Sequence, residues 1–159
     1  MTSGLAMKIY QKNLDAVSEA LMDGDLPKMM RHIAIPNMMS TCDKEIVMSS
    51  PEELDMVMSD FRTQLLSHGV ETYTRICLEA DFVVGRNDMI AGRHETSTTG
   101  ADGVAVSPYL NHMVLMKIDD QWKGVWLQAV MKNTELEILS PDIADAQAEA
   151  HRVLETLRR

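Results

Sequence analysis

The stretch 107-SPYLNHMVLMKIDDQWKGVWLQAVM-131 decides the fold. It predicts two strands, over residues 106–118 and 122–132, because apolar and β-branched residues flank a short polar segment at residues 119–121. A tight turn at that segment makes the two strands an antiparallel hairpin. The hairpin also carries polar and aromatic residues that its formation does not require: Asn111, His112, Trp122, Trp126 and Gln128.

The chain before the hairpin begins with helical periodicity. Residues 5–22 place apolar side chains at steps of three and four, and Gly24 favours a helix end. Asp25 is a suitable N-cap for a second, shorter helix, which we expect to end by Pro36. Residues 37–49 show no clear period, and we expect a loop that holds a short strand.

A third helix has the clearest start signal in the chain. In 50-SPEELDMVMSDFRTQLLSHG-69, Ser50 is a natural N-cap and Pro51 suits the first helical position. Glu53 completes a capping box, and apolar residues then recur at steps of three and four. The stretch therefore predicts an amphipathic helix that ends at its final glycine.

The remaining segments complete a segregated order of helices and strands. Residues 70–84 and 89–99 favour strands, and 100-GADG-103 is typical of a flexible loop. Residues 141–158 predict a capped helix with an apolar side. Helices first, then consecutive strands, then a last helix indicate an α+β protein. We expect a single domain over residues 1–159, since no linker or repeat divides them.

Composition excludes several classes of partner. The formal net charge of −9 disfavours binding to nucleic acid or to an anionic membrane. No apolar run approaches the ~18 residues of a membrane span, and the first residues lack a signal-peptide core, so we expect a cytoplasmic location. Cys42 and Cys77 are expected to be reduced thiols. Neither metal-ligand spacing nor a phosphate-binding glycine motif is present, so no metal or cofactor is expected.

Three local features resemble the NTF2-like superfamily, which includes the SnoaL-like domains and the ketosteroid isomerases. They are the first helix ending in 23-DGDL-26, the capped helix 50–69 followed directly by strands, and the hairpin 111-NHMVLMKIDDQWKGVWLQ-128. The resemblance covers roughly residues 5–135, and the helix at 141–158 lies outside it. It implies a cystatin-like cone, in which a curved antiparallel sheet wraps around the N-terminal helices and encloses a pocket.

The isomerase pattern within this superfamily requires a tyrosine, a carboxylate base and a protonated acid. The resemblance places the tyrosine position near Val17 and the base position near Thr41, with Asp43 close by. It places the acid position on Asn111, whose amide can donate a hydrogen bond. Two of the three roles are therefore missing, unless Asp43 serves as the base.

Other enzymes on this scaffold use a histidine with a carboxylate, which suits acid–base chemistry near neutral pH. His94 and Glu95 cannot both enter the cone from a regular strand, because adjacent residues point to opposite faces. A catalytic pair would have to join residues of different strands. The catalytic candidates are accordingly Asp43, His94 and Asn111.

The alternation of side chains divides the hairpin into two faces. The resemblance points Asn111 into the cone, and the predicted pocket residues are Asn111, Met113, Val125, Leu127, Ala129 and, from the preceding strand, His94. The opposite face is unusually apolar for a face exposed to water. Either the helix 141–158 or a second copy of the chain is expected to cover it, and a homodimer is the preferred prediction. The predicted interface residues are His112, Val114, Trp126 and Gln128.

Three functions remain open at this point, because one fold supports many functions. The first is the binding of a small, largely apolar molecule in the cone. The alternatives are an enzyme of the lyase, isomerase or hydrolase type and a dimerising association module. A polar pair across the pocket would favour the enzyme, whereas a filled cone would favour the association module.

Overall fold

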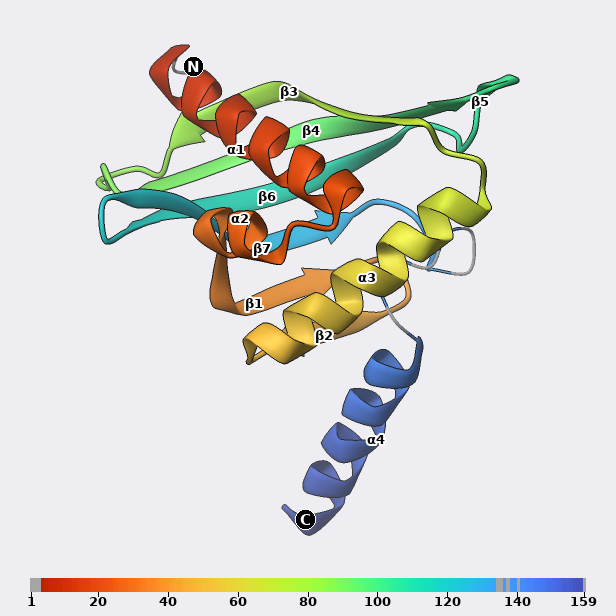
Figure 1. The fold of residues 1–159 in the computed structure, drawn as a ribbon. Helices are drawn as coiled ribbons and strands as arrows, with labels where there is room; N and C mark the ends of the chain where they lie inside the picture. Colours follow the sequence, from red (N-terminus) through yellow and green to blue (C-terminus); the bar gives the residue numbers. More distant parts are fainter. Residues whose placement is uncertain (1–3, 134–135, 137, 140, 159) are drawn as a thin grey trace.

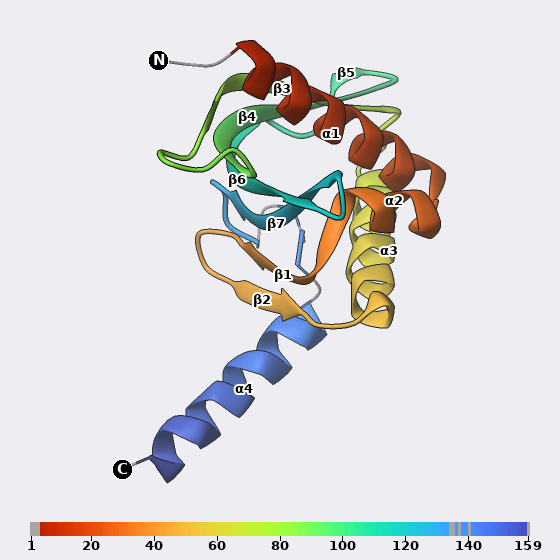
Figure 2. The same ribbon diagram turned by 90° about the vertical axis from the view of Figure 1, so that its left-hand side faces the viewer.

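The computed structural model describes residues 4–133, 136, 138–139 and 141–158. A strongly curved sheet forms one layer, and the N-terminal helices lie against its inner face (Figures 1 and 2). These helices are α1 (Gly4–Asp23), α2 (Leu26–His32) and α3 (Pro51–Ser67). The architecture is α+β, as the order of the sequence signals predicts.

The sheet is mixed rather than wholly antiparallel. Its strands are β1 (Ile33–Ser40), β2 (Glu45–Met48), β3 (Thr72–Phe82), β4 (Met89–Gly100), β5 (Gly103–Val104), β6 (Tyr109–Ile118) and β7 (Gln121–Ala129). Their order is β2-β1-β7-β6-β4-β3, and β5 pairs with β4. The β1–β7 pair is parallel and the other pairs are antiparallel.

The predicted helix starts agree with the structure. The Ser50 hydroxyl accepts a hydrogen bond from the backbone N–H of Glu53 at 3.2 Å. The Asp25 carboxylate accepts one from the backbone N–H of Lys28 at 3.1 Å. Both contacts satisfy N–H groups that have no partner within the helix.

Three local predictions differ from the structure. The second helix already ends at His32, and Pro36 lies inside β1. The region expected to be a loop with one strand is instead the β1–β2 hairpin, with Asn37 paired to Met48. The glycine-rich loop is also shorter than expected, because β4 continues to Gly100 and β5 begins only three residues later.

The last helix, α4 (Pro141–Leu157), projects away from the body of the molecule (Figure 1). Lys44, just before β2, forms an ion pair of 2.9 Å with Asp145 of α4. The Val47 N–H of β2 donates to Gln147 Oε1, and Gln147 Nε2 donates to the Val47 carbonyl. Residues 148–158 are exposed. The alternative in which this helix covers the outer face of its own sheet is therefore wrong.

Two packed clusters flank the centre of the cone. One joins α3 to β1 and β2, and the other joins α1 to β3, β4 and β6. Gly92 allows α1 to approach β4 closely, because a Cβ at that position would lie 2.7 Å from the Tyr10 ring. No helix in the described part of the chain is long and apolar enough to cross a membrane.

Candidate functional site

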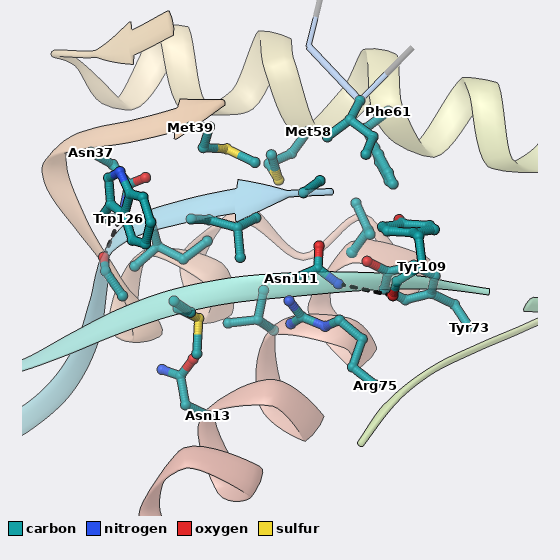
Figure 3. Close-up of a pocket in the computed structure, with 18 residues that line it drawn as sticks. Asn13, Asn37, Met39, Met58, Phe61, Tyr73, Arg75, Tyr109, Asn111 and Trp126 are labelled. Atoms are coloured by element: carbon teal, nitrogen blue, oxygen red, sulfur yellow. Dashed lines mark hydrogen bonds between the residues drawn. The ribbon is translucent and has the colours of Figure 1, made fainter. Parts of the chain in front are cut away.

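A cavity of about 70 Å³ lies inside the cone, between the helices and the inner face of the sheet (Figure 3). Both ends of the described chain contribute to its wall. The described residues that line it are Asn13, Val17, Leu21, Ile33, Asn37, Met39, Met58, Phe61, Tyr73, Arg75, Tyr109, Asn111, Met113, Gly124, Trp126, Leu127, Ala129 and Ile138.

The cavity has an apolar side and a polar side. Met39, Met58 and Phe61 form the apolar side, next to β1 and α3 (Figure 3). Arg75 and Asn111 lie opposite them and come from β3 and β6. A small number of polar groups in an apolar cavity is the usual form of a small-molecule site.

Arg75 supplies the positive charge of the polar side. Its side chain is only 7% exposed. Nε donates to the Ser18 hydroxyl at 2.8 Å, and Nη2 donates to the Leu14 carbonyl at 3.1 Å, both on α1. The guanidinium carbon also lies 5.8 Å from the centroid of the Tyr73 ring. These neighbours are neutral, so they orient the charge without neutralising it.

Asn111 presents an acceptor to the cavity. Its Nδ2 donates to the Thr96 hydroxyl at 2.8 Å and to the Tyr109 carbonyl at 3.5 Å. A main-chain carbonyl can only accept, so this contact assigns the amide orientation. The Oδ1 atom consequently faces the interior, towards Met58 (Figure 3).

Tyr109 is a neutral phenol in this environment. Burial raises its pKa well above the usual value, and the neighbouring Tyr73 raises it further. The Arg75 charge and a hydrogen bond with Thr96 act in the opposite direction, with smaller effect. Tyr109 can therefore serve as a hydrogen-bonding wall residue.

Four predicted pocket residues line the cavity: Asn111, Met113, Leu127 and Ala129. Val125 is not among the lining residues, and Gly124 occupies the wall in its place. The register explains the difference, because Val114 pairs with Trp126 while the next residue, Leu115, pairs with Gly124. Val125 is thus the extra residue of a β-bulge, which reverses the alternation on which its prediction depended.

His94 also lies outside the cavity wall, although it is fully buried. It sits under α1, where the Tyr10 hydroxyl is 2.6 Å from Nδ1. Within the described part of the chain, the Nε2 atom has no hydrogen-bond partner. Burial, with smaller contributions from the charges of Arg75 and His112, lowers the pKa of His94 to about 2. The imidazole is therefore neutral at physiological pH.

Asp43 lies in the exposed turn between β1 and β2. Its carboxylate accepts from the backbone N–H of Asn133 at 2.7 Å and from the Thr41 hydroxyl at 3.0 Å. The Asn133 contact is the main reason that its pKa is lowered. The structure places His94 directly opposite Asn111 in the β4–β6 pair, whereas Asp43 lies apart from both. No carboxylate or imidazole is among the described lining residues.

The predicted interface residues lie on or beside the outer face. His112, Val114 and Trp126 line an outer groove of about 450 Å³, and Gln128 pairs in register with His112. Trp126 also contributes to the wall of the inner cavity. On the same sheet, Arg93 forms an ion pair of 2.9 Å with Glu79.

Arg75, Tyr73 and Tyr109 are among the lining residues that the predicted pocket did not include. A signal for Tyr73 and Arg75 exists in 72-TYTRIC-77, where they share one strand face with Cys77. Tyr73 and Cys77 favour a face that points into the cone, and Arg75 lies on that same face. Arginine on a buried strand face is unusual enough to mark a candidate site.

Comparisons with known proteins give the fold and no function. No family model and no curated protein matches the chain. It is similar to the crystal structure of an NTF-2 like protein of unknown function from Shewanella oneidensis MR-1, with 13% identity and a TM-score of 0.59, covering 77% of this chain and 97% of that one. It is also similar to a domain of unknown function with a cystatin-like fold from Nostoc punctiforme PCC 73102, with 13% identity and a TM-score of 0.59, covering 99% of both chains. The chain thus has the NTF2-like, cystatin-like fold that its sequence predicts.

Proposed function

We propose that the chain binds a small, largely apolar molecule in the cavity of the cone. The observation that carries this proposal is the cavity itself, where an apolar wall faces a few fixed polar groups. Met39, Met58 and Phe61 offer contact surface, whereas Arg75 and Asn111 offer orientation. Neither the ligand nor a wider biological role follows from the fold, because NTF2-like proteins of unknown function share it.

The size of the cavity limits the ligand. About 70 Å³ is well below the ~300 Å³ at which typical small-molecule pockets begin. Methionine side chains change rotamer easily, and Met39, Met58 and Met113 all contribute to the wall. A compact ligand is therefore expected, with some enlargement of the cavity when it binds.

Acid–base catalysis has less support than binding. A general base must lie within hydrogen-bond reach of the proton that it removes. The described lining residues offer hydrogen-bond donors, in Arg75 and Tyr109, but no carboxylate or imidazole. An enzyme on this site would need its base from the ligand or from a rearranged side chain.

Native mass spectrometry of the purified full chain tests the binding proposal, together with thermal-shift screening of compact apolar compounds. Leu127→Phe fills the cavity, and Val125→Phe is the matched control on the same strand outside its wall. We expect ligand-induced stabilisation in the unaltered protein and in Val125→Phe, and its loss in Leu127→Phe. Equal stabilisation of both variants, or the absence of any ligand, would overturn the proposal.

As a second candidate function, we propose that the outer sheet face joins two copies of the chain. The predicted interface group is His112, Val114, Trp126 and Gln128. Exposed apolar residues also occur near it: Leu110 on the same strand as His112, Val130 bonded to Leu110 just after β7, and Ile76 on β3. Exposed apolar surface is typical of an interface. The chain's own α4 projects elsewhere, so it supplies no cover (Figure 2).

Light scattering during size-exclusion chromatography tests the dimer. We expect a dimer for the unaltered chain and for Met56→Lys, which adds a charge to an exposed position of α3. Val114→Lys puts the same charge on the outer face and should give a monomer. A monomeric wild type at high micromolar concentration refutes the interface.

The cytoplasmic location predicted from the sequence stays a prediction.

A further inference from the structure

The buried charge of Arg75 is not neutralised within the described chain. No carboxylate of the described residues lies within 4 Å of its guanidinium nitrogens. A guanidinium has five N–H donors. Two donate to Ser18 and Leu14, and the other three have no acceptor among the residues that the structure describes.

The nearest open groove does not supply the missing partner. Arg75 also borders this groove, which carries the acidic residues Asp15, Glu19 and Asp23. None of them forms an ion pair with the guanidinium. Burying a charge without a counterion is unfavourable, so an anionic partner for Arg75 would stabilise this arrangement.

The cavity offers the position for that interaction. Arg75 and Asn111 lie next to each other on its polar side (Figure 3). Arg75 is the single Lys, Arg or His among the described lining residues. One fixed cation matches one monoanion, whereas a phosphate dianion would leave an excess negative charge in an apolar cavity.

We propose that the ligand carries a carboxylate, which Arg75 binds, and a short hydrocarbon part that contacts Met39, Met58 and Phe61. The planar guanidinium suits a carboxylate because two parallel hydrogen bonds form at once. Asn111 Oδ1 would accept from an N–H or O–H group near that carboxylate. This inference rests on the proposed binding function and gives the chemical class of the ligand.

Matched pairs of ligands test the proposal on the unaltered full chain at pH 7. The probes are butanoate and hexanoate, each compared with its amide, which has the same shape and no charge. Titration calorimetry should show the carboxylate binding at least tenfold more tightly than its amide. Equal affinities of acid and amide refute the carboxylate inference and leave the binding proposal intact. Failure of all four probes, with a different apolar compound bound, also refutes the inference; the absence of any ligand refutes both proposals.

A pair of variants locates the effect. Arg75→Met removes the charge and keeps much of the length, and Arg62→Met is the control, since Arg62 bonds the Met22 carbonyl outside the cavity. The preference for the carboxylate should disappear in Arg75→Met and persist in Arg62→Met. If Arg75→Met still prefers the carboxylate over its amide, another residue recognises the charge and the role of Arg75 is overturned. If that variant does not fold, Arg75→Lys provides the second measurement, with a reduced preference expected because lysine lacks the planar donor pair.

Discussion

Acidification from pH 7 to pH 5 should destabilise the protein through His94. In the folded chain the imidazole is buried next to Tyr10, and its pKa is lowered from 6.5 to about 2. In the unfolded chain it returns to water and to its usual value. Below pH 6.5 the unfolded state therefore binds a proton that the folded state refuses, and the unfolding equilibrium shifts towards the unfolded chain.

The expected size of the effect follows from the two pKa values. Each pH unit between them changes the free energy of unfolding by about 1.4 kcal/mol. From pH 6.5 to pH 5 the loss is about 2 kcal/mol, and it continues to grow until the pH approaches the folded-state value. Domains are typically stable by only ~5–15 kcal/mol, so a loss of this size is readily measured.

Urea unfolding at pH 7, 6 and 5 measures the effect, and His94→Gln removes the titrating group. The variant should be less stable at pH 7. The slope of its free energy of unfolding against pH should be smaller than that of the wild type, by the amount that corresponds to about one proton taken up on unfolding. The exposed His68→Gln variant is the control and should keep the wild-type dependence. His32 has a lowered pKa caused mainly by burial, so a smaller slope of the same sign should remain. A pH dependence that is identical in wild type and His94→Gln would refute the reasoning.

Three further predictions concern stability and attachment. Ser50→Ala removes the N-cap of α3 and should cost about 1 kcal/mol in urea unfolding, whereas Ser49→Ala should have little effect. Gly92→Ala places a Cβ 2.6 Å from the Glu79 backbone oxygen of β3 and 2.7 Å from the Tyr10 ring of α1. It should lower the free energy of unfolding by about 1–3 kcal/mol in urea unfolding. Gly4→Ala is the control and should not, because its Cβ would meet nothing within 4 Å. Gln147→Ala removes both hydrogen bonds between α4 and the β2 backbone, and hydrogen exchange should become faster in α4 while the sheet stays protected.

Features that depend on nearby residues could be predicted from the sequence. Ser50, Pro51 and Glu53 define the start of α3 among themselves, and the structure places the helix at Pro51–Ser67. The parallel pairing of β1 with β7 joins segments that are far apart in the chain, and no local pattern indicates it. Pro36 shows the same limit, because a strand can contain proline where its missing N–H is not needed.

The candidate site was predictable as far as the alternation of the strands is regular. Asn111 and Met113 lie on the inner face, as their positions in β6 predict, and line the cavity. Val125 does not, because the bulge is defined by pairing with β6 rather than by the sequence of β7 alone. His94 and Arg75 both point inward, but the position of α1 covers the first and leaves the second at the cavity.

The polarity of the cavity separates this chain from the isomerase pattern on the same fold. That pattern requires a base that removes a proton and donors that stabilise the negative charge produced. The resemblance predicts the tyrosine position near Val17 and the base position near Thr41, and neither residue type suits its role. A buried cation, Arg75, instead lines the cavity. A fixed positive charge is useful when the negative charge is already part of the ligand, since no base is then needed to create it. The same residues that weaken the catalytic interpretation therefore strengthen the carboxylate-binding one.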